Sequence, residues 1–123
     1  MTTTVMIVDD SRVSRMMLQM YAKELRPDWQ FLEAASGDAA LLAASGRPID
    51  LIVMDVNMPG MNGLDAAAAL KASLPKATVV MLTANVQQST RNKAEEIGLH
   101  FVEKPITAEV TAHIISLLGA TDV

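Results

Sequence analysis

The 123-residue sequence contains no cysteine, and this absence excludes disulfides, thiolate metal sites and thiol catalysis. Aromatic residues are scarce, with one Trp, one Tyr and two Phe, so Ala, Leu, Ile, Val and nine Met must fill the interior. No apolar stretch approaches the length of a membrane span. The N-terminus, in which Met1 and three Thr precede a short apolar run, lacks the basic region and long apolar core of a signal peptide. We therefore expect a cytoplasmic protein with no membrane contact.

Clustered basic charge is also lacking. Ten Lys and Arg oppose fourteen Asp and Glu, which gives a formal net charge of −4. Nucleic-acid binding needs clustered Lys and Arg against the phosphate backbone, so we expect no nucleic-acid partner. Four basic residues do fall along the first expected helix, and we interpret them as a solvated helix face: Arg12, Arg15, Lys23 and Arg26.

Apolar runs and helical patterns alternate five times along the chain, without a linker or a repeat. This alternation predicts a parallel sheet with helices on both faces. We expect one domain over residues 1–123, an α/β doubly wound, flavodoxin-like three-layer sandwich whose five strands have the order 2-1-3-4-5. The expected strands are Val5–Val8, the region of Phe31 and Leu32, Leu51–Met54, Val79–Leu82 and Phe101–Val102. Two of the five expected helices begin directly after Ser11 and Thr107, which can cap them. The other three span Gly37–Ala44, Leu64–Leu74 and 87–97.

Three of these elements carry further expectations. The strand at Phe31 is weaker and should lie at an edge of the sheet. The helix over 87–97 has only Ala94 and Ile97 as clearly apolar residues, so its buried stripe should be thin and the helix weakly held. The first helix carries apolar residues at helical spacing, namely Val13, Met16, Met17, Met20, Tyr21 and Leu25.

Polar residues directly follow four of the apolar strands. Parallel strands place such positions at one edge of the sheet, and the strand order reverses between strands one and three, where ligands bind in open α/β sheets. A single aspartate after a strand is usually a helix cap or turn residue, but the joint pattern points to a site. Its members are Asp9, Asp10, Asp55, Thr83 and Lys104.

Three carboxylates at one place require a cation. Two carboxylates about 4 Å apart repel by roughly 4 kcal/mol at an effective dielectric near 20. Carboxylates, carbonyls and water select hard ions such as Mg²⁺. We expect Asp10 and Asp55 as direct ligands, Asp9 as a ligand through water, and the backbone carbonyl near Asn57 as a further oxygen.

Phosphoryl transfer uses an in-line nucleophile and positive charge around the phosphoryl oxygens. We expect Asp55 to be the nucleophile and to form an aspartyl-phosphate. Lys104 would hold one phosphoryl oxygen, and the Thr83 hydroxyl with nearby backbone N–H groups another. Lys104 would also neutralise the acidic cluster before any phosphate arrives.

Four separated motifs resemble the receiver domains of two-component response regulators. They are Val-Asp-Asp-Ser at 8–11, Asp55 with Asn-Met-Pro-Gly-Met-Asn-Gly at 57–63, Thr83-Ala84 and Lys104-Pro105. The resemblance implies that Asp55 is the phosphoacceptor, Asp9 and Asp10 the acidic pair, Asn57 a metal ligand through its carbonyl, Thr83 the switch hydroxyl and Lys104 the phosphate-binding lysine. It also implies a switch role for Phe101, where the family often has tyrosine, and a cis Lys104-Pro105 bond. Phe101 is equally well explained as a core aromatic.

Rival phosphate sites fail on charge or spacing. No Gly-rich loop with Lys-Ser/Thr exists, and an Asp9-Asp10 pair would repel the phosphate of a flavodoxin-type cofactor. A haloacid-type phosphatase needs an acid where this sequence has Asn57. His100 and His113 have no partner at ligand spacing, so we expect surface or packing roles.

The sequence therefore predicts a Mg²⁺-dependent switch and no enzyme beyond phosphotransfer to, and autodephosphorylation of, Asp55. The resemblance implies a histidine kinase or phosphotransfer protein as donor. The chain stops at Val123, so we expect a stand-alone, chemotaxis-type monomer that binds a downstream protein through helix four, strand five and helix five. The alternative is a phosphorelay intermediate or a non-switching interaction module.

Overall fold

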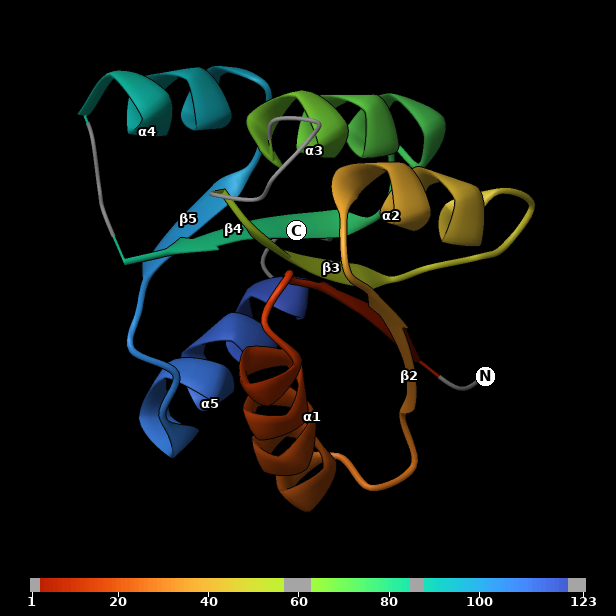
Figure 1. Cartoon of the computed structure of the whole chain (residues 1–123), viewed down its shortest axis with the longest axis vertical. Coiled ribbons are helices and arrows are strands. Elements are labelled where there is room, and N and C mark those ends of the chain that lie inside the picture. Colours follow the sequence, from red (N-terminus) through yellow and green to blue (C-terminus); the bar gives the residue numbers. More distant parts are fainter. Residues whose placement is uncertain (1–2, 57–62, 85–87, 120–123) are drawn as a thin grey trace.

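The structure, a computed structural model, describes residues 3–56, 63–84 and 88–119. Five parallel strands form one sheet in the order β2-β1-β3-β4-β5, and helices cover both of its faces (Figure 1). The predicted fold class and strand order are confirmed. The elements are β1 Thr4–Val8, α1 Arg12–Leu25, β2 Gln30–Ala34, α2 Gly37–Ala44, β3 Leu51–Asp55, α3 Gly63–Ser73, β4 Thr78–Thr83, α4 Gln88–Glu96, β5 His100–Glu103, α5 Ala108–Ser116 and a short 3₁₀ turn, Leu117–Gly119.

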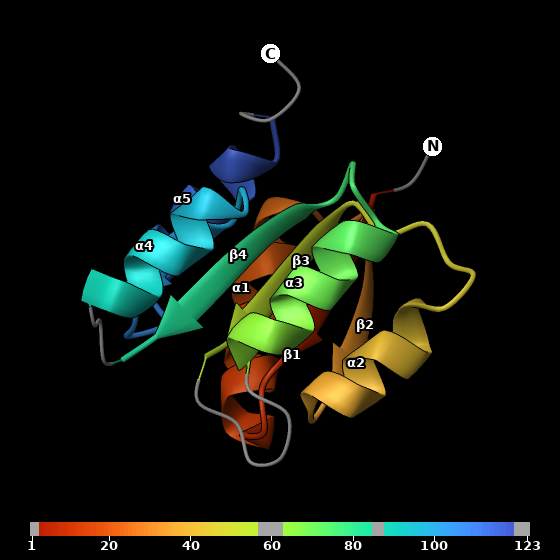
Figure 2. The same cartoon turned by 90° about the horizontal axis from the view of Figure 1, so that it is seen from above.

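The two central strands are buried along their whole length. Every residue of β3 and of β4 is buried, as expected for parallel strands covered on both faces. Helices α2, α3 and α4 lie on one side of the sheet and α1 and α5 on the other (Figures 1 and 2). The core is accordingly split into two clusters, one including Met6, Ile52 and Met81, the other Val53, Leu82 and Ile114.

The predicted helix caps and the predicted edge strand are observed. The side chains of Ser11 and Thr107 accept hydrogen bonds from the backbone N–H groups of Ser14 and Val110, at 3.2 and 3.0 Å. Gly46, after α2, has φ +71°, the left-handed conformation expected of glycine there. β2 is an edge strand with only Ala34 buried. In α4, Ala94 is buried and Ile97, just beyond the helix, is 41% exposed, so its buried stripe is as thin as predicted.

The apolar residues that recur at helical spacing in α1 do not all face the core. The helix is held to the sheet by Leu18 and Ala22, which are buried. Val13, Met16 and Met20 are 65, 57 and 51% exposed. Spacings of three and four residues put these three along one side of the helix, and that side faces solvent. They form an exposed apolar stripe, which no partner within the described residues covers.

Within the described ranges, no helix combines the length and the apolar character that crossing a membrane requires.

Candidate functional site

The register of the sheet places the predicted site residues at similar heights along neighbouring strands. Val8 pairs with Met54, so Asp9 follows β1 beside Asp55, the last residue of β3. Asp55 pairs in turn with Leu82, which precedes Thr83. Asp9 and Asp55 therefore meet at the carboxyl edge of the sheet where the strand order reverses, as the sequence predicted.

Three carboxylates form the acidic pocket. One oxygen of each of Asp9, Asp10 and Asp55 lies within 4.8 Å of the others. Asp9 and Asp55 are buried, whereas Asp10 is exposed. An all-oxygen donor set that is open on one side fits a hard divalent cation that keeps several waters. Mg²⁺ is therefore the ion that these side chains suit best. The expected ligand Asn57 lies outside the described residues.

Lys104 supplies the cationic side of the pocket. Its Nζ lies 3.2 Å from Asp9 Oδ2 and 3.7 Å from Asp55 Oδ2. Its backbone N–H donates to the Thr83 carbonyl at 2.7 Å, which fixes the start of the β5–α5 loop against β4. The Lys104-Pro105 peptide bond is cis, as the resemblance implied. One ammonium facing three carboxylates leaves the pocket negative, so a further cation remains favourable.

Thr83 and Phe101 lie on adjoining strands, with Thr83 at the carboxyl end of β4 and Phe101 two residues before the level of Thr83. Thr83 ends β4 and is fully buried. Phe101 lies in β5, level with Met81 of β4, and packs half-buried against the cluster that contains Ala94 of α4. The structure thus joins Phe101 to the core and to α4, and a switch role remains a prediction.

The loop after β1 is braced by local and long-range hydrogen bonds. The Ser11 N–H donates to Asp9 Oδ1 at 2.8 Å. Arg15 donates from Nη1 to the Asp9 backbone carbonyl at 2.5 Å and from Nε to Glu33 Oε1 at 3.0 Å. With its side chain only 15% exposed, Arg15 is not part of the solvated face predicted for it. No pattern in the sequence predicts these contacts, because one acceptor is a backbone carbonyl and Glu33 lies 18 residues away along the chain.

Gly63 supports the end of β3 through close packing. A Cβ atom at this position would lie 2.5 Å from the Asp55 carbonyl oxygen and 2.6 Å from that of Val56. Both are backbone atoms, so only glycine fits without moving the strand end. The sequence places Gly63 at the end of the motif 57–63 and does not predict this contact. The rest of that motif, 57–62, lies outside the described residues.

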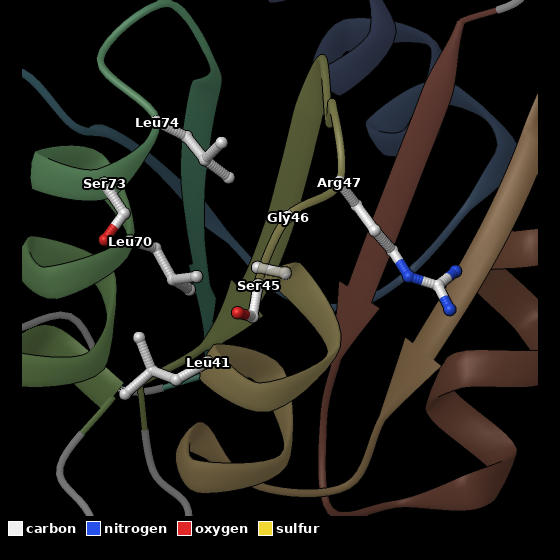
Figure 3. A pocket seen from close by; sticks show the side chains of 8 residues that line it. Leu41, Ser45, Gly46, Arg47, Leu70, Ser73 and Leu74 are labelled. Carbon is white, nitrogen blue, oxygen red and sulfur yellow. The ribbon is translucent and has the colours of Figure 1, made fainter.

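A separate hollow of about 380 Å³ lies at the opposite edge of the sheet, between the ends of α2 and α3. Leu41, Leu70 and Ser73 line it, while the Arg47 side chain extends away from it (Figure 3). None of the predicted site residues lines this hollow.

The two histidines have packing and surface positions, as predicted. His100 in β5 is half-buried, and its Nε2 has no hydrogen-bond partner among the described residues. Desolvation, with smaller contributions from the positive charges of Lys71 and His113, lowers the pKa of His100 below its usual value of 6.5. His113 itself is exposed on α5. Neither histidine lies in the acidic pocket.

Comparison with known proteins points to the same family that the sequence motifs resemble. The family model of the response regulator receiver domain matches residues 5–116. The autoinducer 1 sensor kinase/phosphatase LuxN of Vibrio campbellii is 34% identical over 112 residues, covering 91% of this chain and 13% of LuxN. The transcriptional regulatory protein ResD of Bacillus subtilis is 32% identical over 119 residues, covering 94% of this chain and 48% of ResD. The chain thus spans less than two thirds of these relatives.

The fold also matches a solved structure of about the same length. Vibrio cholerae chemotaxis protein CheY4 superposes with a TM-score of 0.86 at 25% identity, with 96% of this chain and 99% of that chain covered.

Proposed function

Because this chain belongs to the receiver domains of response regulators in two-component systems, we propose that it accepts a phosphoryl group on Asp55 in a Mg²⁺-dependent reaction. One observation carries the proposal: the Lys104 ammonium and three carboxylates converge on the exposed edge where β3 delivers Asp55. A nucleophile, an acidic metal pocket and a fixed cation are what transfer to a carboxylate requires.

Each side chain has a defined task in the transfer. An Asp55 carboxylate oxygen attacks phosphorus, the new P–O bond forms, and the phosphorus–nitrogen bond of a phosphohistidine donor breaks with its electron pair returning to the imidazole, which takes up a proton. Lys104, 3.7 Å from Asp55 Oδ2, is within reach of a phosphoryl oxygen carried by Asp55. The Thr83 hydroxyl would bind another. Asp9, Asp10 and Asp55 would hold Mg²⁺, and the bound ion would supply positive charge beside the phosphoryl group.

Incubation with acetyl phosphate and Mg²⁺ tests this proposal. Intact-mass spectrometry should show one added phosphoryl group, which peptide mapping assigns to Asp55. Asp55→Asn and chelation of Mg²⁺ by EDTA should each abolish it. An unmodified wild-type chain, or modification that persists in Asp55→Asn, would contradict the proposal.

The exposed apolar stripe on α1 supports docking of the donor beside the pocket. Val13 lies three residues after Asp10, and Met16 and Met20 continue the stripe along the helix. Methionine side chains adapt to varied partner surfaces, and exposed apolar groups beside a reactive site favour protein contact. We propose that a histidine kinase or phosphotransfer protein approaches along this helix.

We further propose that phosphorylation signals through the surface of α4, β5 and α5. A phosphate adds about −1.5 to −2 charges and three acceptors. Drawing the Thr83 hydroxyl toward it would shift the start of the segment leading to α4, whose only buried residue is Ala94. Full switching from 1:99 to 99:1 needs a preference of roughly 5.5 kcal/mol.

NMR spectra with and without the phosphate mimic beryllofluoride test the switch. Amide shifts over 84–102 should change, whereas those of α2 should not. Unchanged shifts in 84–102 would favour the alternative, a phosphorelay intermediate or non-switching module. We propose that residues 1–123 act in the cytoplasm as one monomeric receiver module.

A further inference from the structure

Arg15 contacts the backbone of the acidic pocket directly. It lies one turn into α1, and its Nη1 donates to the Asp9 carbonyl oxygen at 2.5 Å. That oxygen belongs to the peptide group joining Asp9 to Asp10. β1 ends at Val8, so the carbonyl lies beyond the regular pairing of the strand, and Arg15 supplies its donor from a helix.

Glu33 on the neighbouring strand holds Arg15 in this position. The Arg15 Nε donates to Glu33 Oε1 at 3.0 Å. With Glu33 44% exposed, the ion pair alone contributes little to stability. Its effect is to orient the guanidinium so that a second N–H points at the Asp9 carbonyl. The Asp9 N–H donates to the Ala34 carbonyl at 3.1 Å. Hydrogen bonds therefore restrain the backbone on both sides of the Asp9 Cα.

The peptide group needs such a restraint because its carboxylates repel one another. Asp10 is exposed and sits at the start of a loop, so rotation of the Asp9–Asp10 peptide would carry its carboxylate away from Asp55. A charge-assisted hydrogen bond to the carbonyl opposes that rotation.

We infer that Arg15, oriented by Glu33, is a positioning residue that holds the Asp9–Asp10 peptide so that the Asp10 carboxylate is preorganised for a divalent cation. The inference rests on the proposed Mg²⁺ site. It gives Arg15 no contact with metal or phosphate. Groups that orient metal ligands typically change metal affinity 10- to 100-fold when they are removed.

Mg²⁺ titration followed by ¹H–¹⁵N NMR measures the effect on the full chain. Arg15→Met, which keeps an unbranched apolar stem and loses every donor, should raise the Kd for Mg²⁺ about 10-fold. Arg15→Lys should recover most of the affinity. Arg91→Met is the matched control, because Arg91 pairs with Glu95 on exposed α4, and its Kd should be unchanged. With acetyl phosphate, Arg15→Met should raise the Mg²⁺ concentration for half-maximal rate and leave the rate at saturating Mg²⁺ close to wild type.

A metal-free readout separates this inference from the proposed function. The ¹³C carbonyl resonance of Asp9 should shift in Arg15→Met and stay unchanged in Arg91→Met. A wild-type Kd in folded Arg15→Met would overturn the inference while leaving the proposed function intact. Failure of the wild-type chain to bind Mg²⁺ would overturn both. Should Arg15→Met not fold, Glu33→Gln decides: a Kd about threefold weaker supports the inference, and a wild-type Kd overturns it.

Discussion

Replacing Asp10 by Asn should stabilise the metal-free protein. The three carboxylates have oxygens within 4.8 Å of one another. At that separation two unit charges repel by about 1 kcal/mol in bulk water and about 3.5 kcal/mol at an effective dielectric of 20. Asp10 is exposed, so the lower value applies to each of its two repulsions. The described ion pairs of Lys104 are with Asp9 and Asp55, so this change relieves repulsion without breaking either pair.

The sign of the effect should reverse when Mg²⁺ is added. Metal that binds only the folded state stabilises it by about 2.7 kcal/mol at 100 times its Kd. Asp10→Asn removes a ligand, so it should lose most of this increment while it keeps the gain of about 1–2 kcal/mol in metal-free buffer. The variant is then the more stable protein without Mg²⁺ and the less stable one with it.

Urea unfolding followed by Trp29 fluorescence measures both states. With a slope of roughly 1–3 kcal/mol per M, the gain of about 1–2 kcal/mol should raise the metal-free midpoint of Asp10→Asn by roughly 0.3–2 M. Glu24→Gln on the exposed side of α1 removes one negative charge away from the pocket and serves as control. A lower metal-free midpoint in Asp10→Asn, or an undiminished response to Mg²⁺, would refute the electrostatic reasoning.

Three further predictions concern the surroundings of the pocket. Gly63→Ala should cost about 1–3 kcal/mol and slow phosphorylation by acetyl phosphate, because the new Cβ meets the Asp55 carbonyl at 2.5 Å. The unfolding free energy should fall as pH drops below 6.5, since the lowered pKa of folded His100 lets the unfolded chain take up the proton first; His100→Gln should flatten that fall in urea unfolding at pH 5–8. Thr107→Ala should cost about 1 kcal/mol in the same assay, because the Val110 N–H loses its capping acceptor.

Each of these predictions has a matched control. Gly46→Ala places a Cβ in open space, so despite its left-handed backbone strain it should leave the phosphorylation rate unchanged; equal rates for both alanine variants would argue against a role for close packing. Lys71 and His113 contribute to the lowered pKa of His100, and His113→Gln should leave most of the pH dependence in place. Thr107→Ser should retain the cap; a loss as large as that of alanine would point to another cause.

The fold could be predicted because its determinants are local in sequence. Leu51–Asp55 and Thr78–Thr83 are buried throughout, and their unbroken apolar runs already indicate central parallel strands. Right-handed connections then leave few strand orders open, and 2-1-3-4-5 is the natural choice among them. The convergence of Asp9, Asp55 and Lys104 follows from that order alone, because each directly follows or ends a strand.

The supporting contacts could not be predicted because they join distant backbone and side-chain atoms. The bond between Arg15 and the Asp9 carbonyl depends on the angle at which α1 crosses the sheet, and the pairing with Glu33 depends on β2 as well. The fit of Gly63 against Asp55 depends on how close α3 approaches the strand end. The composition of the chain carries no information on such distances. From the sequence alone, Arg15 is interpreted as a surface arginine and Gly63 as part of a motif, with no packing role for either.

Two features of the described residues oppose folding stability. The acidic pocket gathers like charges at the ends of buried strands, and α1 exposes Val13, Met16 and Met20 along a stripe that begins three residues after Asp10. Neither is needed to build the sheet, since Leu18 and Ala22 already hold the helix. Features that lower the stability of a fold, with no nearby interaction that offsets the loss, are typical of functional sites. Their adjacency supports the proposal that the stripe brings a protein donor to the pocket, where a bound cation would offset both the repulsion that the metal-free fold retains and the negative charge of the incoming phosphoryl group.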